Sequence, residues 1–273
     1  MFSNIIENVR AKCPIVHNIT NYVTVNDCAN IVLACGASPI MADDINEVED
    51  ITSICSALNI NIGTLNSLTI KSMLAAGKKA GELGHPIIFD PVGAGASELR
   101  TKTALSIVNE VHPTVIRGNI SEIRTISKGS GTTKGVDADI NDKITIENLP
   151  QTVRFAKNLS KETNAVIAIT GAIDIVADSK KAYCIFNGKP MMSSITGTGC
   201  QLSALTAAFV AANTENELEA VAAAVCTMGV CGEIAFERLE KGDGNSTYRN
   251  YIIDAVYNLS GEELERKANY EIR

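Results

Sequence analysis

Residues 86–97 read PIIFDPVGAGAS, and this stretch decides the fold. Its first four residues are all apolar, which is typical of a strand covered on both faces of a sheet. Asp90 ends the apolar run, and the proline and glycines behind it favour a turn. A helical pattern follows at 98–110, so the stretch predicts a strand, a polar turn and a helix in that order.

The same order recurs along the chain. Short β-like runs alternate with longer helical patterns, which predicts βαβ units and a mostly parallel sheet in an α/β fold. We expect one domain over residues 1–273, with the Gly-rich segment 128–143 as an insertion between two elements. Two further runs, 173–178 and 182–187, predict a hairpin. The other predicted strands are 37–41, 59–63, 86–90, 114–118 and 165–170, and the predicted helices lie near 22–35, 65–83, 98–110, 120–127, 149–163, 199–212, 215–239 and 247–258.

Composition excludes several classes of protein. Hydrophobic residues make up 45% of the 273 positions, too many for a disordered chain. The net charge of −7 argues against a nucleic-acid partner, which a basic stripe would indicate. The N-terminus lacks the apolar core of a signal peptide, and the most apolar stretch, 220–232, is expected to be too short to cross a bilayer. The 8 cysteines contain no Cys-x-x-Cys pair, so we expect reduced thiols, no membrane partner and a cytoplasmic location.

Polar residues and glycines gather where the predicted strands end. In an open parallel sheet these positions share the carboxyl edge, where ligands bind. The sequence therefore predicts one cleft built from segments far apart in the chain: Met41–Asp43, Gly63–Thr64, Asp90–Gly93, Arg117–Asn119 and Thr170–Gly171.

The segment SITGTGC (194–200) precedes a helix of small residues at 201–212. Glycines let the backbone approach a ligand closely, and the first amides of a helix attract anions. Gly197, Thr198, Gly199 and Cys200 thus predict an anion hole for phosphate, although a glycine turn without a ligand fits equally well. Neither the P-loop nor the dinucleotide fingerprint occurs in the chain.

Three other polar groups each allow two interpretations. Asn119 and Glu122 form a capping box or lie near magnesium-bound phosphate, and the two roles are compatible. Asp90 belongs to a turn or binds Mg²⁺, which prefers hard oxygen ligands. The cluster at 17–21 (HNITN) caps a helix beginning near residue 22 or forms a loop that faces the ligand.

Several motifs occur together and in order. They are HNITNYV (17–23), GASPIMA (36–42), NIGT (61–64), DPVGAGAS (90–97), RGNISEI (117–123), AITG (168–171) and SITGTGC (194–200). As a set, they strongly resemble the hydroxyethylthiazole kinase family of thiamine salvage, within the ribokinase-like superfamily, over residues 14–240. The resemblance implies a three-layer α/β/α fold without a lid. It also implies phosphorylation of the primary alcohol of 5-(2-hydroxyethyl)-4-methylthiazole by ATP, with Mg²⁺ required.

The resemblance also implies residue roles. Arg117, Thr170 and Asn119 match the nucleotide side of the site, and Gly197–Cys200 match the anion hole. Asp90 and Glu122 match positions near the metal, Glu122 through water. Met41 and Gly197 match thiazole contacts, with Asn21, Val23, Gly63 and Pro91 as the pocket wall. The family pattern further implies a homotrimer with thiazole sites at subunit interfaces.

Cys200 departs from the superfamily pattern, in which an Asp acts as the base for the attacking hydroxyl. Some thiazole kinases carry Cys there. A free thiol has a pKa of about 8.5; the helix N-terminus lowers it, and ATP phosphates raise it. We expect Cys200 to position the hydroxyl and to accept its proton only in part, unless it is a buried cysteine without a chemical role.

Other functions stay open from the sequence. Within the superfamily, the chain could be a hydroxymethylpyrimidine kinase or another small-alcohol kinase. A nucleotide-dependent repair dehydratase shares the fold but needs an Asp where Cys200 stands. A cysteine enzyme would need a base beside Cys200, and the sequence does not place one. A binding protein without catalysis would not explain why Asp90, Asn119 and Glu122 converge with Gly197–Cys200.

Overall fold

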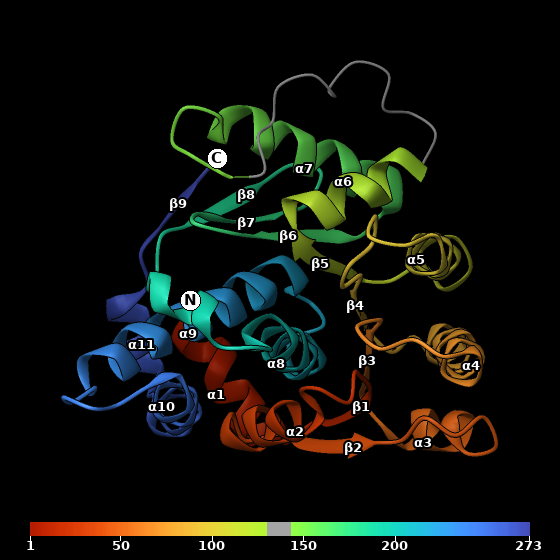
Figure 1. The fold of residues 1–273 in the computed structure, drawn as a ribbon, viewed down its shortest axis with the longest axis horizontal. Coiled ribbons are helices and arrows are strands. Elements are labelled where there is room, and N and C mark those ends of the chain that lie inside the picture. The colour runs from red at the N-terminus through yellow and green to blue at the C-terminus, as the bar shows by residue number, and fades with distance from the viewer. Residues whose placement is uncertain (130–142) are drawn as a thin grey trace.

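A nine-stranded sheet forms the middle layer of the computed structural model, which describes residues 1–129 and 143–273. The strand order is β2-β1-β3-β4-β5-β6-β7-β8-β9, with parallel pairing from β2 to β6 and antiparallel pairing from β6 to β9 (Figure 1). The strands are β1 (Ile15–Ile19), β2 (Ser38–Met41), β3 (Ala57–Asn61), β4 (Ile87–Asp90), β5 (Val115–Asn119), β6 (Val166–Thr170), β7 (Asp174–Ala177), β8 (Ala182–Ile185) and β9 (Tyr270–Ile272).

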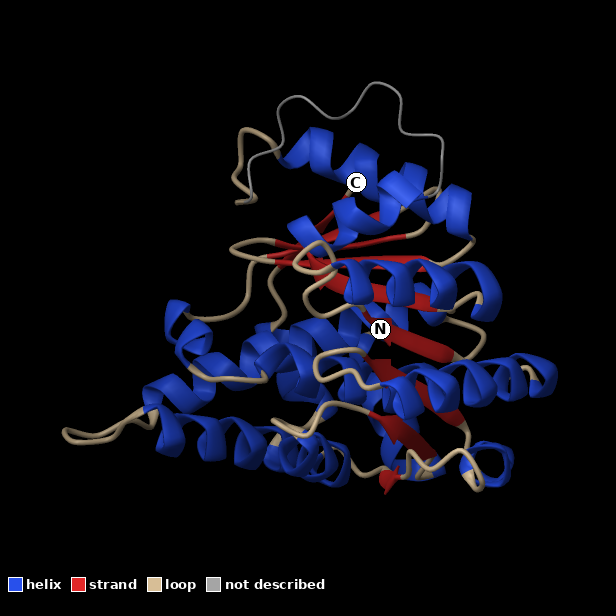
Figure 2. Cartoon of the chain, turned by 45° about the vertical axis from the view of Figure 1, so that its right-hand side comes forward, coloured by secondary structure: helices blue, strands red, loops and turns tan. Residues whose placement is uncertain are grey.

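Helices cover both faces of this sheet, as Figure 2 shows, so the predicted three-layer α/β/α fold is confirmed. The helices are α1 (Phe2–Lys12), α2 (Val25–Ala34), α3 (Val48–Ile54), α4 (Ser67–Leu83), α5 (Glu98–Val111), α6 (Ile120–Gly129), α7 (Leu149–Thr163), α8 (Thr198–Ala212), α9 (Glu217–Glu237), α10 (Asn245–Asn258) and α11 (Gly261–Lys267), with a 3₁₀ turn η1 (Pro190–Ser194).

The order of the first three strands sets the place of the ligand cleft. The chain leaves β1 for β2 on one side and then returns across β1 to β3 on the other. Right-handed crossovers in opposite directions place their helices on opposite faces, so α2 lies with α8 and α9 while α3 to α7 cover the other face (Figure 1). Ligands bind at such a reversal, beyond the carboxyl ends of the strands.

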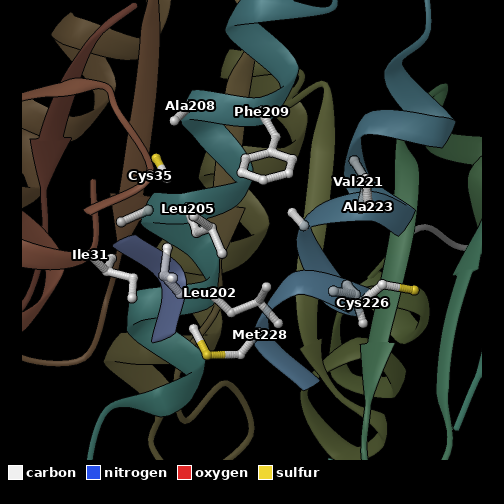
Figure 3. Close-up of a cluster of buried hydrophobic side chains, with 14 of the residues drawn as sticks. Ile31, Cys35, Leu202, Leu205, Ala208, Phe209, Val221, Ala223, Cys226 and Met228 are labelled. Atoms are coloured by element: carbon white, nitrogen blue, oxygen red, sulfur yellow. The ribbon is translucent and has the colours of Figure 1, made fainter. Parts of the chain in front are cut away.

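The helices α8 and α9 form the centre of the larger core. Nearly every residue of α8 is buried, since α2, α9 and the sheet surround it. Figure 3 shows Ile31 of α2 beside Leu205, and Phe209 between α8 and α9. The alanine-rich helices predicted at 199–212 and 215–239 are therefore packed within one chain.

The expectation that the most apolar stretch is too short to cross a bilayer does not hold for the helix that contains it. Residues 220–232 belong to α9, whose 21 residues are long and apolar enough to span a membrane by composition alone. Within the described fold, however, 83% of its apolar window is buried. The apolar surface of α9 is therefore used for core packing.

The polar cluster at 17–21 was misread only in part, because Asn21 lies between β1 and α2, where its Oδ1 accepts from the amide of Thr24 and its Nδ2 donates to Cys200. His17 and Asn18 lie inside β1 and are buried, so they form neither a helix cap nor a loop, and α2 begins only at Val25. The apolar pattern did not predict this strand because two of its five residues are polar. The elements α1, α3, α11, η1 and β9 were not predicted either. The predicted segment 128–143 lies almost entirely outside the described residues.

His17 is held in its strand by two hydrogen bonds. Its Nε2 lies 2.9 Å from the carbonyl oxygen of Ala42, which can only accept, so Nε2 carries a proton. Its Nδ1 lies 2.9 Å from Oγ1 of Thr52, a hydroxyl that donates to the carbonyl oxygen of Val48 at 2.7 Å. The ring thereby links β1 to the segment after β2 and to α3.

We predict that acid destabilises the protein through His17. Burial lowers the pKa of His17 below its usual 6.5, so the unfolded chain binds a proton more readily than the folded one. The contribution of His17 is therefore complete above pH 6.5 and is lost as pH falls through the folded-state pKa. Urea unfolding between pH 7.5 and 5 should show a loss of up to about 1.4 kcal/mol per pH unit from this group.

The variant His17→Gln should be less stable at pH 7.5 but lose less stability on acidification. His112→Asn serves as the control, because His112 is an exposed residue at the end of α5. Equal pH slopes for wild type and His17→Gln would contradict the prediction.

Candidate active site

Asp90 is the buried acid at the centre of the cleft. It ends β4, and its Oδ2 accepts hydrogen bonds from Asn61 Nδ2 at 2.9 Å, Ser203 Oγ at 2.8 Å and Arg117 Nη1 at 3.2 Å. These three donors come from β3, α8 and β5. One carboxylate oxygen thus joins four elements of the fold at the sheet edge.

The other oxygen of Asp90 has no such partner. Within the described residues, no donor reaches the buried Oδ1. Burial raises the pKa of the carboxyl, while the positive charge of Arg117 opposes the shift. A buried carboxylate oxygen without a partner is costly, so this atom suits a cation, a water or a ligand hydroxyl.

Cys200 lies beside this acid at the start of α8. Its Sγ accepts hydrogen bonds from Asn21 Nδ2 at 3.2 Å and Asn61 Nδ2 at 3.3 Å. Burial raises the pKa of the thiol, and the charge of Asp90 raises it further. The amide of Asn21, the hydroxyl of Thr24 and the charge of Arg117 act in the opposite direction but do not prevail, so the net shift is upward.

The predicted anion hole begins at Gly197, the residue before α8. Its φ of 88° lies in the left-handed region, and a Cβ there would come within 2.2 Å of Thr24 Cγ2. At Gly199, a Cβ would lie 2.7 Å from the guanidinium nitrogens of Arg117. The missing side chains therefore allow the first turn of α8 to approach both α2 and Arg117 closely.

Arg117 connects the acid to a cavity of about 670 Å³. While Nη1 faces Asp90, Nη2 donates to Thr170 Oγ1 at 2.7 Å. Arg117, Thr170, Thr198 and Gly199 line one part of the cavity, and the remaining wall includes apolar residues from α8, α9 and η1: Leu202, Val225, Met228, Pro190 and Met192. A basic, amide-rich part beside an apolar part suits a nucleoside phosphate.

Asn119 and Glu122 form the capping box that the sequence favoured. The amide of Glu122 donates to Asn119 Oδ1 at 2.9 Å, and the amide of Asn119 donates to Glu122 Oε2 at 2.8 Å. The other oxygen, Oε1, accepts from the amide of Gly93 at 2.8 Å. Both carboxylate oxygens are thus engaged by backbone groups, which leaves Glu122 suited to an outer position around a metal.

The residues predicted for the thiazole pocket fall into two groups. Asn21 reaches Cys200, and a Cβ on Gly63 would lie 3.0 Å from Asn21, while Pro91 is buried directly after Asp90. Val23 is 57% exposed, and Met41 is half-buried at the end of the edge strand β2. The structure thus brings the first three residues to the acid and leaves the other two at the periphery of the site.

Three residues of the site were not predicted individually from the sequence. Asn61 and Ser203 donate to Asp90, and Arg100 donates to the carbonyl oxygens of Val92 and Gly63 at 2.6 Å each. The only sequence signal is the spacing of Asn59 and Asn61, which share one face of β3 at the strand period of two. Among the described residues, no group of three or more His, Cys, Asp or Glu could hold a metal by itself.

Comparison with known proteins places these features in one family. Residues 6–262 match the model of the hydroxyethylthiazole kinase family. The hydroxyethylthiazole kinase of Clostridium acetobutylicum is 65% identical over 271 residues, 99% of each chain. The solved hydroxyethylthiazole kinase of Pyrococcus horikoshii OT3 superposes with a TM-score of 0.89 at 34% identity, covering 100% of this chain and 98% of the other. Staphylococcus aureus pyridoxal kinase, at 14% identity and a TM-score of 0.61, covering 95% and 97%, shares the fold.

We predict that Gly199→Ala lowers activity without unfolding the protein. Alanine favours the helix, but its methyl group must push the guanidinium of Arg117 away from Asp90 and Thr170. Gly81→Ala in α4 is the matched control, because nothing lies within 4 Å of its added Cβ. That control should gain about 0.5–1 kcal/mol of stability with unchanged activity.

Thermal unfolding measures the stability of both variants, and turnover with a nucleotide substrate measures their activity. Gly199→Ala should lose at least roughly tenfold in kcat/KM, the effect of about 1.4 kcal/mol. Wild-type turnover by this variant would show that the close approach of α8 to Arg117 does not matter for function.

Proposed function

We propose that this chain, which belongs to the hydroxyethylthiazole kinase family, is a kinase of thiamine salvage. It transfers a phosphoryl group from ATP to the primary alcohol of 5-(2-hydroxyethyl)-4-methylthiazole. The observation that carries this proposal is the meeting of Asp90, Arg117 and Cys200 at the first turn of α8, beside a cavity sized for a nucleotide. Phosphoryl transfer depends mainly on positioning and charge stabilisation, and this arrangement supplies both.

On the nucleotide side, we assign the phosphates to the basic end of the cavity. The amides of Gly197, Thr198, Gly199 and Cys200 would form the anion hole, with the guanidinium of Arg117 beside them. Thr170 fixes that guanidinium through the 2.7 Å hydrogen bond, and Asn119 lies at the end of the same strand as Arg117.

Mg²⁺ fits the same edge of the site. The partnerless Oδ1 of Asp90 suits a metal-bound water or the ion itself, and Glu122 suits a water-mediated position because backbone amides engage both of its oxygens. When bound, the ion would neutralise charge on the phosphates. Asp90 keeps its own orientation through Asn61, Ser203 and Arg117.

On the acceptor side, Cys200 would hold the alcohol. Asn21 and Asn61 fix its sulfur, and the raised pKa keeps the thiol protonated at neutral pH. The protonated thiol would therefore orient the hydroxyl oxygen toward the anion hole, and only the small thiolate fraction could accept the proton of the alcohol. This suffices because a loose transition state places little demand on a base.

We also propose a cytoplasmic homotrimer of a single-domain chain, with each thiazole site completed at a subunit interface. The exposure of apolar residues next to the site supports this arrangement, since Tyr22 is 79% and Val23 57% exposed. Met41 at the end of edge strand β2 lies at the periphery as well. Sedimentation equilibrium at the mass of a monomer would refute the trimer.

The assay of ADP release tests the main proposal. With ATP, Mg²⁺ and the thiazole alcohol, we expect turnover and a product one phosphate heavier by mass spectrometry. Hydroxymethylpyrimidine and an assay without acceptor are the controls, and chelation of the metal should abolish activity. Equal or faster turnover of hydroxymethylpyrimidine would move the assignment to another alcohol kinase, and no acceptor-dependent turnover would refute a kinase.

Variants of Cys200 test its role separately. Cys200→Ala removes the group that orients the alcohol, so kcat should fall by roughly 10²-fold, the low end for a positioned proton-transfer group. Cys200→Asp supplies a carboxylate and should keep or raise turnover. Full activity of Cys200→Ala, with an unchanged pH profile, would rule out any role for the thiol.

A further inference from the structure

Asp174 is an acidic group in the large cavity that the proposed mechanism does not use. It begins β7 and lines the same cavity as Arg117, Thr170 and Thr198. Its Oδ1 accepts a hydrogen bond of 2.8 Å from the amide of Gly171. This bond closes the turn that carries the chain from Thr170, the last residue of β6, into β7.

The negative charge of Asp174 disfavours contact with phosphate. A carboxylate repels the phosphates that the basic end attracts. On one side, Gly171 joins Asp174 to Thr170, which accepts the hydrogen bond from Arg117. On the other side, Asp174 pairs with Ile185 of β8, directly before Phe186 and Asn187 of the cavity wall. Asp174 thus lies between the basic end of the cavity and this part of its wall, which is where we place the sugar of a nucleotide.

The second oxygen of Asp174 is available to a ligand. Among the described residues, no hydrogen-bond donor is found for Oδ2, and this oxygen is not one of the fully buried atoms. Burial raises the pKa of the carboxyl to about 7, although the amide of Gly171 and the charge of Arg117 oppose the shift. An uncharged donor from a ligand would stabilise the ionised carboxylate without adding charge to the cavity.

We propose that Asp174 selects ribonucleotides by accepting a hydrogen bond from a ribose hydroxyl of the bound nucleotide. The inference rests on the proposed function for the presence of ATP in this cavity. It assigns the recognition of the sugar to a negatively charged group, in addition to the recognition of the phosphates by Arg117. The hydroxyl donates its proton to Oδ2, while Oδ1 keeps the turn in place through Gly171.

Binding of nucleoside diphosphates, measured by calorimetry without turnover, tests this inference. Of 2′-deoxy-ADP and 3′-deoxy-ADP, the one that lacks the donating hydroxyl should bind wild type at least about tenfold more weakly than ADP does. The reason is the loss of a hydrogen bond to a charged acceptor. Asp174→Asn keeps an oxygen for the amide of Gly171 but replaces the charged acceptor with a neutral NH2 group, from which a ribose hydroxyl can still accept. Because the charge-assisted hydrogen bond is lost, this variant should weaken ADP more than the deoxynucleotides and so reduce the preference.

Asp178→Asn is the matched control, since Asp178 lies at the other end of β7 and accepts from the amides of Lys180 and Lys181 at 2.6 Å each. It should bind all three nucleotides as wild type does. In the kinase assay, Asp174→Asn should raise the KM for ATP and leave kcat within about threefold at saturating ATP, since the lost contact affects binding and not transfer.

Three results would overturn the inference. The first is that wild type binds the deoxynucleotides as tightly as ADP. Asp174→Asn could weaken all nucleotides by one factor, as expected of a residue that only supports the turn. The preference could instead depend on the base, with inosine diphosphate discriminated and the deoxynucleotides not. A protein that selects ribonucleotides but does not phosphorylate the thiazole alcohol would refute the proposed function and leave the role of Asp174 intact.

Discussion

The fold depends on the neutralisation of one buried carboxylate. Asp90 lies at the end of a central strand, out of contact with water, and receives donors from β3, β5 and α8 on a single oxygen. An unpaired charge at this depth would cost several kcal/mol. The paired charge therefore fixes the register of α8 against three strands, and it also places the amides of the first turn of α8 over the carboxyl edge of the sheet.

That placement requires small side chains on α8. Gly197 and Gly199 leave room for Thr24 and for the guanidinium of Arg117, and the alanines that follow let α8 pack on every side. A helix buried all round cannot show the amphipathic pattern of a surface helix. The apolar composition of α8 and α9 thus follows from the need to bring backbone amides to a polar site in the interior of the fold.

The sequence predicted the elements whose local pattern matches their environment. Apolar β4 and β6 and the capping box of Asn119 and Glu122 depend on neighbours in the chain, so local rules identified them. Strand β1 was missed because His17 and Asn18 are satisfied by distant residues, Thr52 and Asn59 among them. The roles of Asn61 and Ser203 were hidden for the same reason, since each donates to Asp90 from at least 29 residues away. Arg100 donates to nearby Val92, but its bond to Gly63 spans 37 residues.

The nature of the group at position 200 follows from Asp90. A carboxylate there would place a second negative charge beside a buried acid, and the repulsion would raise the pKa of the pair toward neutral pH, where a carboxylate is a better base. A thiol avoids this repulsion, and its raised pKa shows that the site favours its neutral form. The two amides that donate to its sulfur hold it in place whether or not it ionises. Under the proposed mechanism, rate enhancement would therefore come mainly from the amides of the first turn of α8 and from Arg117, which stay polarised or charged throughout, and from the orientation that a neutral Cys200 would give to the alcohol.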